Sequence, residues 1–157
     1  MSACSGRAPG PAVTWASYCD LAPSPAVSYG TGVQLEPGLS ARVSLVVSDT
    51  DTAVAMRSGA VEVLSTPRLI ALCEEATCLA VANALSKSHT SVGVRVQFDH
   101  LSPVRVGSEV TADAVLERVE GRRLVFTVSA SDSSGLVGAG RVTRVVVTTE
   151  EFLSKAR

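Results

Sequence analysis

The sequence contains few aromatic residues, almost no net charge and no long hydrophobic run. Phe, Tyr and Trp make up 4% of the 157 residues, and 14 basic side chains against 15 acidic ones leave a formal net charge of −1. No basic cluster could follow a phosphate backbone, so we expect no nucleic-acid partner. No apolar run approaches the roughly 20 residues that span a bilayer, and the N-terminus lacks the basic and apolar regions of a secretion signal. The sequence therefore predicts a cytoplasmic protein without a membrane partner.

The sequence also lacks the short motifs of several enzyme classes. It has no GxSxG, CxxC, HExxH or Walker-type glycine loop. Its four cysteines, Cys4, Cys19, Cys73 and Cys78, are not spaced as metal ligands. We interpret Cys73 and Cys78 as reduced thiols that act as small buried side chains. We expect no metal and no redox cofactor.

The character of the chain changes at about residue 34. Residues 1–34 are rich in Ser, Ala, Gly and Pro and show no sustained hydrophobic period, so we predict an irregular N-terminal arm. Residues 35–157 carry helical and strand periods and are predicted to form one domain. The chain is 46% hydrophobic, which is enough for one buried core, and it has no internal repeat.

Residues 65–85, STPRLIALCEEATCLAVANAL, are predicted to form a helix. Thr66 can cap its N-terminus, and Pro67 fits its first turn. Apolar side chains lie almost all round it, namely Leu69, Ile70, Leu72, Ala76, Leu79, Val81 and Leu85. We therefore expect other elements to enclose this helix.

Alternating apolar and polar residues predict strands at about 39–46, 91–101, 109–119, 123–133 and 136–149. The second strand is expected to point Val92, Val94, Val96 and Phe98 at the core, with His100 at the next inward position. One strand, an enclosed helix and four antiparallel strands make an α+β domain, in which a curved antiparallel sheet wraps a long central helix. This is the layout of the hotdog fold. Such a sheet leaves an edge strand and one helix end poorly covered, so we expect a homodimer.

Titratable side chains occupy unusual places in this layout. Glu74 and Glu75 lie in the middle of the enclosed helix, where burying an unpaired carboxylate costs on the order of several kcal/mol. At least one of them needs a partner, a solvent-filled cleft or a dimer seam. A carboxylate beside the imidazole of His100 would form a general base. Alternatively, His100 is a strand-end residue that reaches water or a backbone carbonyl.

Thr66 is the candidate nucleophile, although capping of the helix competes for the same oxygen. It lies eight residues before Glu74, roughly 12 Å along a helix axis, so the two cannot bond directly within one helix. Arg144 shares a strand face with Val142 and Val146. If it is buried there, it requires a carboxylate partner.

The sequence resembles the hotdog-fold acyl-CoA thioesterases, and most closely the fluoroacetyl-CoA thioesterase-like group, over about residues 37–153. The resemblance lies in STPRLIALCEEA, in GVRVQFDHLSPVRVG, in EGRRLVFTVSASD, and in GAGRVTRVVV with the terminal EEF. It implies that Thr66, Glu74 rather than Glu75, and His100 are the catalytic residues. It also implies that Gly93 and Arg144 lie at the substrate.

The sequence departs from this group in two places. Pro67 stands where the group has a glycine, next to Thr66, where it can alter the approach of the substrate. No Phe, Tyr or Trp occurs from Gly30 through Gln97, whereas the fluoroacetyl-selective member covers its site with phenylalanines. We therefore expect a preference for ordinary acyl-CoAs over fluoroacetyl-CoA.

The sequence thus predicts a homodimeric thioesterase that hydrolyses a small or medium acyl-CoA. His100 and Glu74 would activate water or Thr66, and backbone N–H groups near the helix start would stabilise the oxyanion. Two alternatives stay open. The string HLSPVRVG suggests a hotdog enoyl-CoA hydratase, although the Asp and His pair of that class is missing. A hotdog module could also bind acyl-CoA without catalysis.

Overall fold

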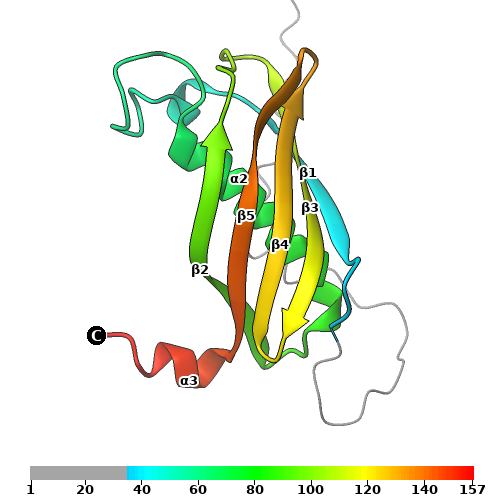
Figure 1. Ribbon diagram of the computed structural model, residues 1–157. Coiled ribbons are helices and arrows are strands. Elements are labelled where there is room, and N and C mark those ends of the chain that lie inside the picture. The colour runs from blue at the N-terminus through cyan, green and yellow to red at the C-terminus, as the bar shows by residue number, and fades with distance from the viewer. Residues whose placement is uncertain (1–34) are drawn as a thin grey trace, which may run out of the picture.

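The computed structural model describes residues 35–157, and the predicted arm at 1–34 lies outside this part of the chain. Five strands form one antiparallel sheet in the order β1-β3-β4-β5-β2. In chain order they are β1 (Ser40–Val46), β2 (His89–His100), β3 (Glu109–Glu120), β4 (Arg123–Asp132) and β5 (Gly135–Thr148). The sheet curves around the helix α2 (Thr66–Val81), which crosses its inner face (Figure 1). The predicted α+β hotdog layout is confirmed.

Short helices complete the described part of the chain. They are the 3-10 turns η1 (Asp49–Asp51) and η2 (Ala82–Ala84) and the terminal helix α3 (Thr149–Leu153). The predicted helix over 65–85 therefore ends earlier as an α-helix, because it tightens into η2 after Val81. None of these helices is long and apolar enough to cross a membrane.

The core lies between α2 and the inner face of the sheet. The predicted inner residues of β3 and β4 are all buried, namely Val110, Ala112, Ala114, Leu116, Leu124, Phe126, Val128 and Ala130. From the helix, Leu69 and Leu72 are at most 1% exposed, and each such burial contributes about 1.5–3 kcal/mol. The opposite side of α2 is less covered, because Ile70, Glu74 and Cys78 stay partly exposed. Within one chain the predicted enclosure of α2 is therefore incomplete.

Ser65 caps α2, and the prediction that Thr66 is the cap is wrong. The backbone N–H of Arg68 donates to Ser65 Oγ at 3.2 Å, while Thr66 and Pro67 are the first two helical residues. A proline fits there because its missing N–H would have no partner within the helix. Because Ser65 caps the helix, the Thr66 hydroxyl has no capping role.

Strand β2 does not keep the single alternation that the sequence suggests. Its pairing with β5 shifts between Gly93 and Arg95, which is a β-bulge at Val94. A bulge adds one residue and so exchanges the faces of the residues on its two sides. Beyond it Phe98 and His100 face the helix as predicted, but before it Gly93 does so and Val92 faces outward. The predicted inward positions of Val92 and Val94 are therefore wrong, since Val94 is the bulge residue and is 53% exposed.

Candidate active site

Thr66 and His100 meet at the start of α2. Thr66 Oγ1 and His100 Nδ1 are 2.9 Å apart, and His100 Nε2 lies 3.0 Å from the backbone oxygen of Ser102. A carbonyl oxygen can only accept a hydrogen bond, so Nε2 carries the proton of the neutral ring. Nδ1 is then the acceptor, and the Thr66 hydroxyl donates to it. This arrangement is that of a nucleophile and its general base, with a carbonyl as the orienting third group.

The end of β2 fixes the imidazole. The backbone N–H groups of Leu101 and Ser102 both donate to the carbonyl of Val137, at 2.7 and 3.2 Å. Pro103 follows and restricts Ser102 to extended backbone conformations. The Ser102 carbonyl therefore has a fixed position from which it holds His100 Nε2.

The start of α2 is tied to the same segment. The N–H of Leu64 donates to the carbonyl of Val104 at 2.8 Å, and Val63 forms an isolated β-bridge with Arg105. Val104 is 1% exposed and anchors this junction in the core. The residues before Thr66 and those after His100 are thus bonded to each other, which holds the two side chains in register.

The helix start offers few N–H groups for an oxyanion. Pro67 has none, and the N–H of Arg68 is used by Ser65 Oγ. The N–H of Thr66 donates to no other group within residues 35–157. The expected oxyanion site is therefore reduced to this single N–H, at the positive end of the helix dipole.

The buried Arg144 and the partly exposed Glu74 form a second cluster. Glu74 Oε1 lies 3.5 Å from Arg144 Nη1, and the Arg144 side chain is 7% exposed. Arg144 also donates to Ser91 Oγ at 2.9 Å, to the Ser91 carbonyl at 2.7 Å and to Thr77 Oγ1 at 3.4 Å. The prediction that Arg144 requires a carboxylate is confirmed. Gly93 belongs to this cluster, because a Cβ there would collide with Glu74 Oε1.

Glu75 has a different environment from Glu74. Its Oε1 lies 2.9 Å from Arg68 Nη1, and Arg68 Nε lies 3.1 Å from Asp51 Oδ1. Burial by itself would raise the pKa of Asp51, but hydrogen bonds from Ser48 and the charge of Arg68 outweigh it, so the pKa is lowered. Glu75 therefore belongs to a network that ties η1 to α2, away from the Arg144 cluster.

The structure does not bring Glu74 to His100 within one chain. Eight helical residues separate Glu74 from Thr66, roughly 12 Å along the axis. Seven strand residues separate Gly93 from His100, roughly 20 Å. The predicted site residues therefore fall into two groups: Thr66, Pro67 and His100 at one place, and Glu74, Gly93 and Arg144 at another.

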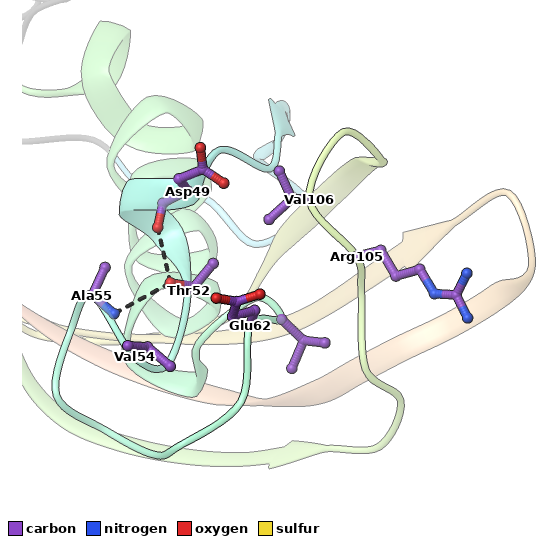
Figure 2. A pocket seen from close by; sticks show the side chains of 8 residues that line it. Asp49, Thr52, Val54, Ala55, Glu62, Arg105 and Val106 are labelled. Carbon is purple, nitrogen blue, oxygen red and sulfur yellow. Dashed lines mark hydrogen bonds between the residues drawn. The ribbon is translucent and has the colours of Figure 1, made fainter.

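A hollow of about 600 Å³ lies beside the loop that precedes α2 (Figure 2). Asp49 and Glu62 bring carboxylates to it, and Thr52 is held by hydrogen bonds with the Asp49 carbonyl and the Ala55 N–H. Arg105 also lines the hollow, so one cationic and two anionic side chains border it. The sequence pattern gave no indication of this hollow.

The cysteines and acidic residues form no metal site in the described part of the chain. Within residues 35–157 no three His, Cys, Asp or Glu side chains are grouped as metal ligands. Cys73 and Cys78 are free thiols. Burial, and then the charge of Glu74, raise the pKa of Cys73 to about 12. Cys73 is thus a protonated, buried side chain, and Cys4 and Cys19 lie outside the described residues.

The curved sheet around α2 is the hotdog fold, and a hydroxyl paired with an imidazole at a helix start is suited to acyl transfer. The sequence profile of FlK, the fluoroacetyl-CoA-specific thioesterase, matches residues 47–150. A fluoroacetyl-CoA thioesterase from Streptantibioticus cattleyicolor is 36% identical over 96 residues, which are 61% of this chain and 69% of that protein. The chain belongs to this family, and it is an acyl-CoA thioesterase.

Solved structures agree with this assignment. A structure of the fluoroacetyl-CoA thioesterase FlK has a TM-score of 0.74 and 30% identity, covering 78% of this chain and 95% of that one. A hot-dog-like protein from Thermanaerovibrio acidaminovorans has a TM-score of 0.70 and 33% identity, covering 76% and 88%. The similarity therefore extends over most of the described domain.

Proposed function

We propose that Thr66 is the nucleophile and His100 the general base of this thioesterase. The observation that carries the proposal is the 2.9 Å contact between Thr66 Oγ1 and His100 Nδ1. His100 takes the hydroxyl proton while Oγ1 bonds to the thioester carbonyl carbon. The C–S bond then breaks, and the proton passes to the departing CoA thiolate. Water, deprotonated by His100, hydrolyses the threonine ester to the free acid.

The exposed Pro67 forms part of the approach to Thr66 in this scheme. It directly follows the nucleophile and lies on the surface of the first helical turn. Its ring has no N–H, so it contributes shape and not a hydrogen bond to the bound thioester. The Thr66 N–H is left to face the developing oxyanion, where a donor is worth more than in water.

A homodimer would join the two groups of site residues. Strand β2 is at the edge of the sheet, with Val94 53% and Val96 37% exposed. Antiparallel pairing of β2 with its copy, centred near Gln97, would place His100 of one subunit opposite the bulge at Gly93 and Val94 of the other. Glu74 of that subunit lies against Gly93, so it would reach the neighbouring His100.

The substrate in this proposal is an ordinary small or medium acyl-CoA. The loop before α2 is exposed from residue 54 to 62, and its larger apolar side chains are Val54, Met56 and Val61. Without aromatic residues it cannot form a tight cover over one small acyl group. The free thiols Cys73 and Cys78 are consistent with a reducing compartment, so we place the enzyme in the cytoplasm.

Release of free CoA from a series of acyl-CoAs tests the proposal. We expect His100→Ala to lower kcat by about two to four orders of magnitude. His89→Ala is the matched control, because His89 bonds Ser86 and Ser88 at the far end of β2. Binding of acyl-CoA without CoA release by the wild type would favour a binding module. Equal turnover of the two histidine variants would refute the role of His100.

Mixing two inactive variants tests the shared site. If His100 acts with Glu74 of the other subunit, His100→Ala mixed with Glu74→Gln forms heterodimers in which one of two sites is intact. Random exchange makes half of the dimers heterodimers, so about a quarter of wild-type activity returns. If both residues act within one chain, the mixture stays inactive. A monomeric, active protein in light scattering would also refute the dimer.

A further inference from the structure

Phe98 lies next to the catalytic pair on the inner face of the sheet. It precedes His100 by two residues on β2, and both face the helix side. Their cross-strand partners on β5 are glycines, Gly140 for Phe98 and Gly138 for His100. Strand β5 therefore carries no side chain at these two positions, and β2 occupies the space at both of them, with the Phe98 ring at Gly138 and the backbone of Gln97 and Phe98 at Gly140.

The ring of Phe98 fills the space above Gly138. A Cβ on Gly138 would lie 2.6 Å from Phe98 Cζ and 2.7 Å from Cε1, both closer than real side chains approach. The Phe98 ring thus extends diagonally from Gly140, its own cross-strand partner, toward Gly138, the partner of His100. It takes the place of a side chain at position 138, which is the cross-strand partner of His100. Phe98 as a residue is half-buried.

We propose that Phe98 is a specificity-determining residue that forms the wall of the acyl site beside Thr66 and His100. This inference rests on the proposed function. Two other phenylalanines occur within residues 35–157, but Phe126 is fully buried in the core and Phe152 is on the terminal helix. Phe98 is therefore the aromatic residue that meets an acyl chain at the catalytic pair, and its ring limits the length of that chain.

Chain-length selectivity tests this role. The wild type and Phe98→Ala are compared on acetyl-, butyryl- and hexanoyl-CoA, with kcat/KM for each. Because one methylene in an apolar pocket changes selectivity by about ten- to two-hundredfold, we expect Phe98→Ala to raise the hexanoyl-to-acetyl ratio at least about tenfold. Val96→Ala is the control, since Val96 also faces inward on β2 but farther from His100, and it should leave the ratio unchanged.

The packing of the ring is tested separately by thermal unfolding. Gly138→Ala alone should lower Tm because the methyl group meets the ring. Combined with Phe98→Ala it should cost less, since of the three atoms nearest to that Cβ only the Asp99 carbonyl oxygen, at 2.9 Å, then remains. If Gly138→Ala alone does not fold, a folded double variant shows the same coupling. Additive effects on Tm would refute the position of the ring.

The two proposals fail in different ways. If the wild type releases CoA from no substrate, the proposed function is wrong. If it releases CoA and Phe98→Ala keeps the wild-type chain-length profile, the role of Phe98 is wrong while the function stands. Equal shifts in Phe98→Ala and Val96→Ala would also overturn the inference, because the change would then come from loosening of β2.

Discussion

Adjacent hydroxyls at the start of α2 allow capping and catalysis to be separated by single substitutions. Ser65→Ala removes the acceptor for the Arg68 N–H and also the contact of Ser65 Oγ with Met56 Sδ at 2.8 Å. Loss of an N-cap costs about 0.5–2 kcal/mol, and Ser65 is 1% exposed, so we expect the upper half of that range. For a domain of this size the loss lowers Tm by about 3–6 °C. The Thr66 hydroxyl is untouched, so kcat should change little.

Thr66→Ala should do the reverse. It removes an exposed hydroxyl that caps nothing, so Tm should stay near that of the wild type, while kcat falls by about two to four orders of magnitude. Thr66→Ser keeps the hydroxyl and should retain much of the activity. Tm from calorimetry and kcat from CoA release are measured on the same preparations. A large loss of Tm in Thr66→Ala with activity retained would refute our reading of the helix start.

Three further predictions follow from the charged clusters and the loop. Glu74→Gln should reduce kcat far more than Glu75→Gln, which breaks only the pair with Arg68; similar values for the two would contradict the assignment. The pKa of Asp51 is lower in the folded protein, so its contribution to stability is complete above the unfolded value of about 3.9 and is lost as pH falls below it. Asp51→Asn should therefore flatten the acid side of a stability profile, and an unchanged slope would argue against this. Finally, kcat/KM for acetyl- and fluoroacetyl-CoA should agree within about tenfold, or about 1.4 kcal/mol, after correction for thioester reactivity.

Periodicity predicted most of the fold because burial and side-chain spacing are directly linked. The predicted buried residues of β3 and β4 are confirmed. Apolar and polar residues that alternate over ten or more positions allow only one face of the strand to be buried. The bulge at Val94 could not be predicted in this way. The extra residue changes the face of Val92, but no residue type marks its place. Valines occur both before the bulge, at Val92, and after it, at Val96.

Thr66 and His100 could be proposed as site residues from the sequence, but the contact between them could not. His100 and Thr66 stand out because each is a reactive side chain at the end of an apolar element. Their contact depends on the Leu64 to Val104 hydrogen bond, which joins segments forty residues apart and leaves no local pattern. The sequence predicted Thr66 as the cap of α2, whereas the extended backbone of Ser65 and its hydrogen bond from the Arg68 N–H identify Ser65 as the cap.

The Ser102 carbonyl belongs to the backbone, so no side-chain substitution can remove it from the site. In a site oriented by a carboxylate, substitution of that side chain abolishes the orientation and reveals its importance. Here Ser102→Ala leaves the oxygen in place, because every residue carries a backbone carbonyl. Within one chain, an alanine scan would therefore detect Thr66 and His100 but not the Ser102 carbonyl. The position of the Ser102 carbonyl can be changed only by altering the backbone around it. Substitution of Pro103 would do this, and so would a change of the backbone at Val137, whose carbonyl accepts from Leu101 and Ser102.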